Sequence, residues 1–164
     1  IARVAILPYL QALGERWRDG DASVAQEHFA STLLRGRLLG LARGWDRGLG
    51  PRAVLACPPG ERHDLGLVIF GLALRERGWR VTFLGPDTPI ETLAAAAEVL
   101  EPAAVILCAL TPTHFESARS QIAGLAARHT VYVGGAGATA DFAAATGTHL
   151  LEGDPVTTAG QLSG

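Results

Sequence analysis

One loop of this chain carries a histidine and a carboxylate at a spacing that suits metal binding. Glu61, His63 and Gly66 read E-x-H-x-x-G within PPGERHDLG, between a predicted strand and a predicted helix. An imidazole is a good ligand for a metal such as cobalt, and a carboxylate two residues earlier can hold its other ring nitrogen and so fix its tautomer and basicity. The same two side chains also fit a plainer role, as a solvated loop pair that caps the helix.

Two further strand ends carry small residues. Cys108 and Leu110 form C-x-L at the end of one predicted strand, 41 residues after the first motif, and Gly134 and Gly135 end the next strand after a further 23 residues. A glycine pair at a strand end permits close approach of a ligand to the main chain. For Cys108 taken alone, a small buried apolar residue is at least as good an explanation as a polar contact.

The elements that position these residues alternate between strand and helix. Five β-rich runs, RAVLACPP, RVTFLGPD, AAVILCALTP, TVYVGG and THLLEGDP, are separated by helical stretches. This pattern predicts a flavodoxin-like (Rossmann-like), doubly wound parallel sheet of five strands. Ligands bind outside the carboxyl ends of such strands, so the loops after the strands converge on one binding edge. Asp87 and Thr88 of GPDTP could touch a cofactor there, although helix capping explains them nearly as well.

The first part of the chain is predicted to be helical. One helix ends near Trp17, and a second runs from about Ala22 to Ala42 with Ser23 among its N-cap candidates. The chain begins inside a helical pattern and without the charged start of a signal peptide, so we expect a fragment of a longer protein. The predicted parts are a helical cap over 1–44, which is part of a helical bundle, a linker over 45–52 and an α/β domain over 53–164.

The three spaced motifs together resemble the B12-binding pattern D-x-H-x-x-G, S-x-L and G-G. The resemblance implies a cobalamin-binding domain in which His63 is the lower cobalt ligand, Glu61 supports it, and the cofactor's nucleotide tail lies between the second and third motifs. Glu61 stands where many members have aspartate, and Cys108 stands where they have serine, a better donor. Residues expected to contact the cofactor here are Glu61, Arg62, Gly66, Asp87, Thr88, Cys108, Leu110, Gly134 and Gly135.

The helical part narrows the resemblance. Trp17 is followed after nine residues by Glu27 and His28, and Val24 shares a helix face with both. Without a family resemblance, a tryptophan at the end of a helix is usually a core residue, and a glutamate such as Glu27 is usually exposed to solvent. Before a B12 domain, however, W-x9-E-H within SVAQEHFASTLLRGRL resembles the CarH-type, or LitR-type, light-responsive transcriptional regulators. That resemblance implies adenosylcobalamin, with Trp17 and Val24 against the adenosyl group and with Glu27 and His28 near its polar edges.

One position departs from that pattern with a chemical consequence. Arg18 stands where members can carry a histidine that captures cobalt once the adenosyl group has gone. A guanidinium stays protonated and cannot take that role, so His28 becomes a candidate for it. No metal role is expected for three other histidines, although the first could lie near the groove; these are His114, His129 and His149.

Composition excludes several classes of function. The net charge is −2, and the 14 positive residues are all arginines scattered along the chain, which argues against direct binding to nucleic acid or membranes. The two cysteines sit in apolar stretches, and Cys57 is predicted to be a packed core thiol. No apolar run approaches the ~18 residues of a membrane span. We therefore expect a cytoplasmic protein.

The expected function is that of an adenosylcobalamin-binding, light-sensing module of a transcriptional regulator. We expect it not to be an enzyme, to form a homo-oligomer (dimer or tetramer), and to reach DNA only through an N-terminal domain outside this chain. The alternative is a corrinoid methyl carrier of a methyltransferase system, which exposes cobalt to partner enzymes. A phosphoacceptor or dinucleotide-binding domain fits poorly, because the chain has no lysine and PPGERHDLG lacks G-x-G-x-x-G.

Overall fold

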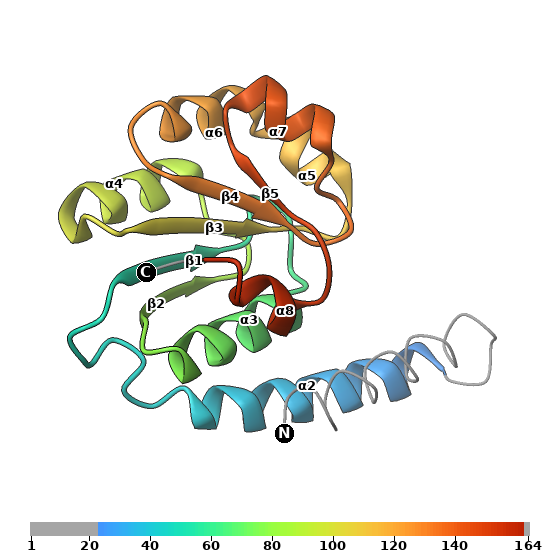
Figure 1. Ribbon diagram of the computed structural model, residues 1–164. Helices are drawn as coiled ribbons and strands as arrows, with labels where there is room; N and C mark the ends of the chain where they lie inside the picture. Colours follow the sequence, from blue (N-terminus) through green and yellow to red (C-terminus); the bar gives the residue numbers. More distant parts are fainter. Residues whose placement is uncertain (1–22, 163–164) are drawn as a thin grey trace. The chain divides into compact units, whose positions relative to one another are not determined.

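The computed structural model describes residues 23–162 of a chain that divides into two compact units, Ile1–Arg43 and Gly44–Gly164 (Figure 1). The described part of the first unit is dominated by the helix α2 (Val24–Leu41). Ser23 forms a capping box with Gln26, in which its Oγ accepts the Gln26 N–H at 3.2 Å and Gln26 Oε1 accepts the Ser23 N–H at 2.9 Å. The predicted second helix and its N-cap are confirmed, and the helix predicted to end near Trp17 lies outside the described residues.

The second unit is built on a parallel sheet of five strands, as predicted, and the strand order is β2-β1-β3-β4-β5. The strands are β1 (Arg52–Ala56), β2 (Arg80–Gly85), β3 (Ala104–Cys108), β4 (Val131–Gly134) and β5 (His149–Leu151). From β1 the chain first adds β2 on one side and then β3 on the other. The loops after β1 and β3 therefore leave in opposite directions, and this switch point is where doubly wound sheets bind ligands.

Helices cover both faces of this sheet. They are α3 (Leu65–Glu76), α4 (Ile90–Leu100), α5 (Pro112–Ser117), α6 (Arg119–Ala126), α7 (Ala140–Thr146) and α8 (Pro155–Ala159). Figure 1 shows α3 and α8 on one face and α4, α6 and α7 on the other, in agreement with their contacts. Because both faces are covered, β1 and β3 are almost continuously apolar and buried, where a half-exposed strand would alternate.

One hydrophobic core lies between the sheet and the helices from α4 to α7. Leu107 and Val133 enter it from neighbouring strands, and Phe115 packs against Phe142 with their ring centroids 5.2 Å apart. These side chains are buried, so they anchor α5 and α7 against the ends of β3 and β4. The core thereby places the loops after those strands next to each other.

The segment predicted as a linker, 45–52, is attached to the α/β unit. Trp45 is buried, its carbonyl accepts the Val81 N–H at 2.7 Å, and its ring meets Phe83 edge-on with centroids 5.9 Å apart. β1 then begins at Arg52. Across residues 23–162, none of the helices combines the length and apolar character needed to cross a membrane.

Packing around Trp45 depends on a glycine in α3. A Cβ at Gly71 would lie 2.7 Å from Cη2 and Cζ3 of Trp45 and 3.2 Å from Cδ2 of Leu55. We expect Gly71→Ala to lower the free energy of unfolding by about 1–3 kcal/mol through overpacking. Urea denaturation followed by circular dichroism measures this. Gly124→Ala in α6 is the matched control, because nothing lies within 4 Å of its added Cβ; if both variants were equally stable, the packing described for Trp45 would be wrong.

Candidate functional site

The loop between β1 and α3 turns its carboxylate inward and its histidine outward. The Glu61 side chain is 0% exposed, whereas the His63 side chain is 72% exposed. Gly60 has φ +83°, a conformation that suits glycine, and it makes the turn that separates these two directions. A buried carboxylate and an accessible imidazole thus stand two residues apart at the carboxyl end of β1.

Glu61 fixes the orientation of the His63 ring. Its Oε1 accepts the His63 backbone N–H at 2.9 Å and lies 2.7 Å from the ring Nδ1. An ionised carboxylate can only accept hydrogen bonds, so the proton of the neutral ring is assigned to Nδ1. Nε2 is then the nitrogen that presents a lone pair for a metal.

The second oxygen of Glu61 reaches the segment after β3. Its Oε2 accepts the Leu110 N–H at 2.8 Å and lies 3.1 Å from Nδ1 of His114 on α5. The His114 ring also lies against the turn, because a Cβ added to Gly60 would be 3.2 Å from His114 Cδ2. The sequence predicted no metal role for His114, although it placed this residue near the groove. A single carboxylate therefore connects the two loops that flank the switch point.

These contacts determine the charge of Glu61. Burial alone raises the pKa of the carboxyl, but the hydrogen bonds from the backbone of His63 and Leu110, together with the His63 ring, outweigh burial and lower the pKa to about 2. Glu61 is therefore ionised at neutral pH. A buried charge of this kind is stable only while its donors stay in place.

The interpretation of Glu61 and His63 as a solvated pair that caps α3 is wrong. The N-cap residue of α3 is Asp64, and no side-chain capping bond is made there. Glu61 is fully buried, and its oxygens accept the N–H groups of His63 and Leu110, neither of which belongs to that helix. The geometry instead matches a carboxylate that supports a metal-binding histidine.

Helix capping likewise fails to explain Asp87 and Thr88. The N-cap residue of α4 is Pro89, with no side-chain capping bond. Thr88 is buried and donates its hydroxyl to the Gly85 carbonyl at 3.0 Å, while Asp87 Oδ1 accepts the Gly60 N–H at 2.7 Å. Both residues therefore hold loops at the binding edge, and their contact with a cofactor stays a prediction.

The second and third motifs meet in register. Cys108 pairs with Gly134 across β3 and β4, and a Cβ at Gly135, where φ is +85°, would lie 2.4 Å from the Ala109 carbonyl oxygen. No larger residue fits that approach. Burial, and secondarily the charge of Glu61, raise the pKa of the Cys108 thiol to about 12, so the thiol is protonated and is no thiolate ligand at neutral pH.

The remaining predicted residues of the α/β unit surround this edge. Arg62 is exposed next to His63, and Leu110 is 47% exposed although its N–H is bound by Glu61. Gly66 lies in the first turn of α3 with nothing within 4 Å of an added Cβ. There is therefore open space beside the histidine loop.

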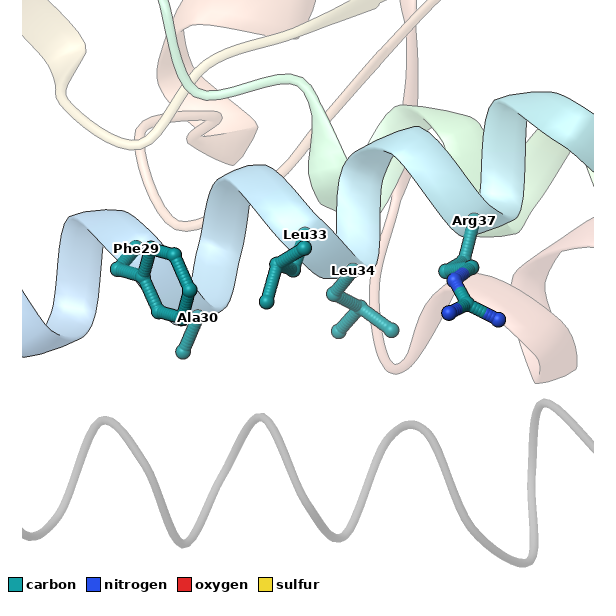
Figure 2. Close-up of a pocket in the computed structure, with 5 residues that line it drawn as sticks. All are labelled: Phe29, Ala30, Leu33, Leu34 and Arg37. Carbon is teal, nitrogen blue, oxygen red and sulfur yellow. The ribbon is translucent and has the colours of Figure 1, made fainter.

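The predicted residues of the helical unit are described less fully. Val24, Glu27 and His28 fall within α2, but their side chains lie outside the description, as does Trp17 altogether. What α2 does show is an open apolar pocket along one side, with Phe29 68% and Leu33 52% exposed (Figure 2). The residues that line it are Phe29, Ala30, Leu33, Leu34 and Arg37.

Two curated proteins are similar in sequence. The chain is 40% identical over 137 residues to the HTH-type transcriptional repressor CarA of Myxococcus xanthus, a match that covers 81% of this chain and 46% of CarA. It is 43% identical over 97 residues to the HTH-type transcriptional repressor CarH of the same organism, covering 59% of this chain and 32% of CarH. The chain thus spans less than half the length of either relative.

Solved structures share the fold at low sequence identity. The monomethylamine corrinoid protein of Methanosarcina barkeri has a TM-score of 0.74 at 16% identity, with 93% of this chain and 76% of that chain covered. A cobalamin-binding protein of Desulfitobacterium hafniense has a TM-score of 0.62 at 22% identity, with 93% and 75% covered.

The family model described as "B12 binding domain" matches residues 51–157, which include all five strands and the histidine loop. This match covers well over half of the chain and agrees with the buried carboxylate, the exposed imidazole and the glycine-lined strand ends. The chain belongs to the B12-binding domain family and is similar to the repressors CarA and CarH.

Proposed function

We propose that this chain is the adenosylcobalamin-binding, light-sensing module of a transcriptional regulator, with Nε2 of His63 as the lower cobalt ligand. The observation that carries the proposal is the buried, ionised Glu61, which holds Nδ1 of an exposed histidine. A carboxylate in this position increases the basicity of the imidazole and restricts its rotation, and both effects favour a metal bond at the other nitrogen.

The residues at this edge suit a metal ion that is already coordinated by a cofactor when it binds. His63 offers one nitrogen, which suits a cobalt ion whose equatorial positions are filled by a corrin ring. The open space beside Gly66 fits a long ligand such as the nucleotide tail of the cofactor, and Gly135 packs against the Ala109 carbonyl, which fixes the backbone beside that proposed groove. Cys108 contributes a small, uncharged group to that groove.

The helical unit supplies the upper face in this proposal. The match to CarA covers 81% of the chain, more than the second unit contains, so the similarity extends into residues 1–43. We assign Trp17 and Val24 to packing on the adenosyl group, and Glu27 and His28 to its polar edges. When bound, adenosylcobalamin supplies a cobalt–carbon bond that visible light breaks, and the helices then lose the group on which they pack.

The regulatory part of the proposal rests on the two repressor relatives. DNA is bound by a part of the regulator outside this chain, and the module itself catalyses no reaction. It works in the cytoplasm as a homo-oligomer, a dimer or tetramer, whose assembly changes when the adenosyl group leaves. The ligand makes different contacts with the two states of the protein, and for this reason its loss changes DNA binding.

The first test exposes the adenosylcobalamin complex to green light and follows its absorption spectrum and its elution in size-exclusion chromatography. We expect a bound corrin spectrum in the dark and, after light, a new spectrum together with a changed elution volume. A complex with cyanocobalamin, which lacks the adenosyl group, is the control. Binding without any light-dependent change of assembly would favour the corrinoid methyl carrier, and absence of binding would refute the proposal.

Removal of the lower ligand tests His63 directly. We expect His63→Ala to weaken adenosylcobalamin binding by about tenfold or more, as loss of a metal contact does. In protein labelled with ¹⁵N-histidine, EPR of bound cob(II)alamin should show a doublet splitting from the axial nitrogen, and this variant should lose it. The matched control is His149→Ala, an exposed histidine at the start of β5, at the opposite end of the sheet. Equal affinity and splitting in the two variants would exclude His63 as the ligand.

The charge of Glu61 predicts a pH dependence of stability in the cofactor-free protein. The pKa of Glu61 in the folded state, about 2, lies below its ordinary value of 4.5, so the folded state binds fewer protons than the unfolded state. The resulting contribution of Glu61 to the free energy of unfolding is complete above about pH 4.5. It is lost as the pH falls towards 2, and its size is up to about 3 kcal/mol. We expect the difference in unfolding free energy between the parent and Glu61→Gln to shrink between about pH 6 and about pH 3. A difference that is independent of pH would mean that Glu61 is not ionised in the fold.

A further inference from the structure

The Gly60 turn of the loop that carries His63 is bound by Asp87, a residue of the neighbouring loop after β2. Asp87 binds it twice: its Oδ1 accepts the Gly60 N–H at 2.7 Å, and its own N–H donates to the Glu61 carbonyl at 2.8 Å. These two bonds hold both ends of the short Gly60–Glu61 segment. The segment that aims Glu61 inward and His63 outward is therefore fixed from outside its own loop.

These bonds continue the pairing of β1 and β2 beyond the ends of the strands. Cys57 donates its N–H to the Gly85 carbonyl at 2.9 Å and accepts the Thr88 N–H at 3.0 Å. Asp87 then makes the last contacts of this series, next to the turn at Gly60. The side chain of Glu61 continues from there to the backbone and ring of His63. A connected path of hydrogen bonds thus runs from β2 to the histidine.

The backbone of Asp87 indicates that its side chain matters. Its φ is +50°, in the left-handed region where glycine costs least and where aspartate and asparagine are tolerated. Glycine in this position would lack the acceptor for Gly60. Capping of α4 does not account for the carboxylate either, because Pro89 is the N-cap residue. The bond to Gly60 is the contact that the structure gives this carboxylate.

We infer that Asp87 is a positioning residue for cobalt ligation: its carboxylate holds the Gly60 turn so that Glu61 can orient His63. The inference rests on the proposed function, since it takes His63 as the lower ligand. It assigns Asp87 to the support of the histidine loop instead of to contact with the cofactor. It also predicts that the site requires an acceptor oxygen at position 87, which the amide of asparagine offers as well as a carboxylate does.

Three variants separate the possible roles of the side chain. Asp87→Asn keeps an acceptor oxygen and tolerates the left-handed backbone, Asp87→Gly keeps only the backbone freedom, and Asp87→Ala keeps neither. Glu98→Gln is the control, because it alters a surface ion pair with Arg128 at the far end of α4. Urea denaturation of each variant reports whether the fold as a whole has been weakened.

Two readouts follow. In the cofactor-free protein, hydrogen exchange measured by mass spectrometry should be about fivefold or more faster over residues 58–64 in the alanine and glycine variants, and unchanged in the asparagine variant. In the loaded protein, those two variants should bind adenosylcobalamin about fivefold to tenfold more weakly. They should also show less of the ¹⁵N-histidine doublet in the EPR spectrum of cob(II)alamin, and asparagine should restore both signals.

The outcomes distinguish the inference from the proposal beneath it. A parent protein without the histidine doublet overturns the proposed function and the inference together. The inference alone is overturned if the parent shows the doublet and the alanine and glycine variants equal the parent in hydrogen exchange, adenosylcobalamin affinity and EPR splitting. Loss of unfolding free energy with an unchanged doublet also overturns it, because Asp87 would then support the fold and not the ligand. Loss of the doublet at unchanged stability, with rescue by asparagine, supports it.

Discussion

The candidate site depends on one buried charge. Glu61 has no exposed surface, yet it is ionised at neutral pH because the backbone N–H groups of His63 and Leu110 and the His63 ring hydrogen-bond to its oxygens. An unpaired carboxylate in that place would cost several kcal/mol, so the donors must be present whenever the fold is present. Since they come from the loop after β1 and from the segment after β3, the charge also fixes the distance between the two sides of the switch point.

The fold was largely predictable because its signals are local. Alternating β-rich and helical stretches predict a parallel sheet with helices on both faces, and the capping box at Ser23 marks the start of α2. Segment 45–52 shows the limit of such reasoning. Its glycines and prolines are typical of a linker, but Trp45 is buried between α3 and the sheet. The Trp45 ring fits there because Gly71 has no side chain, and composition does not reveal that fit.

The site was predictable where side-chain identity carries the information. E-x-H marks the buried carboxylate and the exposed histidine, and G-G marks the close backbone approach. Leu110 binds Glu61 through its backbone N–H, a group that almost every residue has. The amino-acid type at position 110 therefore does not indicate this hydrogen bond. His114 lies 53 residues from Glu61, and only the three-dimensional fold brings them together. Asp87 sits in a sequence typical of helix capping, and its actual partner is in another loop.

The contacts that orient His63 all come from the second unit, Gly44–Gly164. The orientation of the His63 ring is therefore set within this unit, and less conformational entropy remains to be lost when a ligand binds to that ring. In the proposed function this has a consequence for signalling. A lower face that is already rigid cannot report whether the adenosyl group is present, because a signal requires contacts that differ between the two states. The change must then begin at the residues proposed for the adenosyl group, Trp17, Glu27 and His28, while the sheet holds the corrin in place.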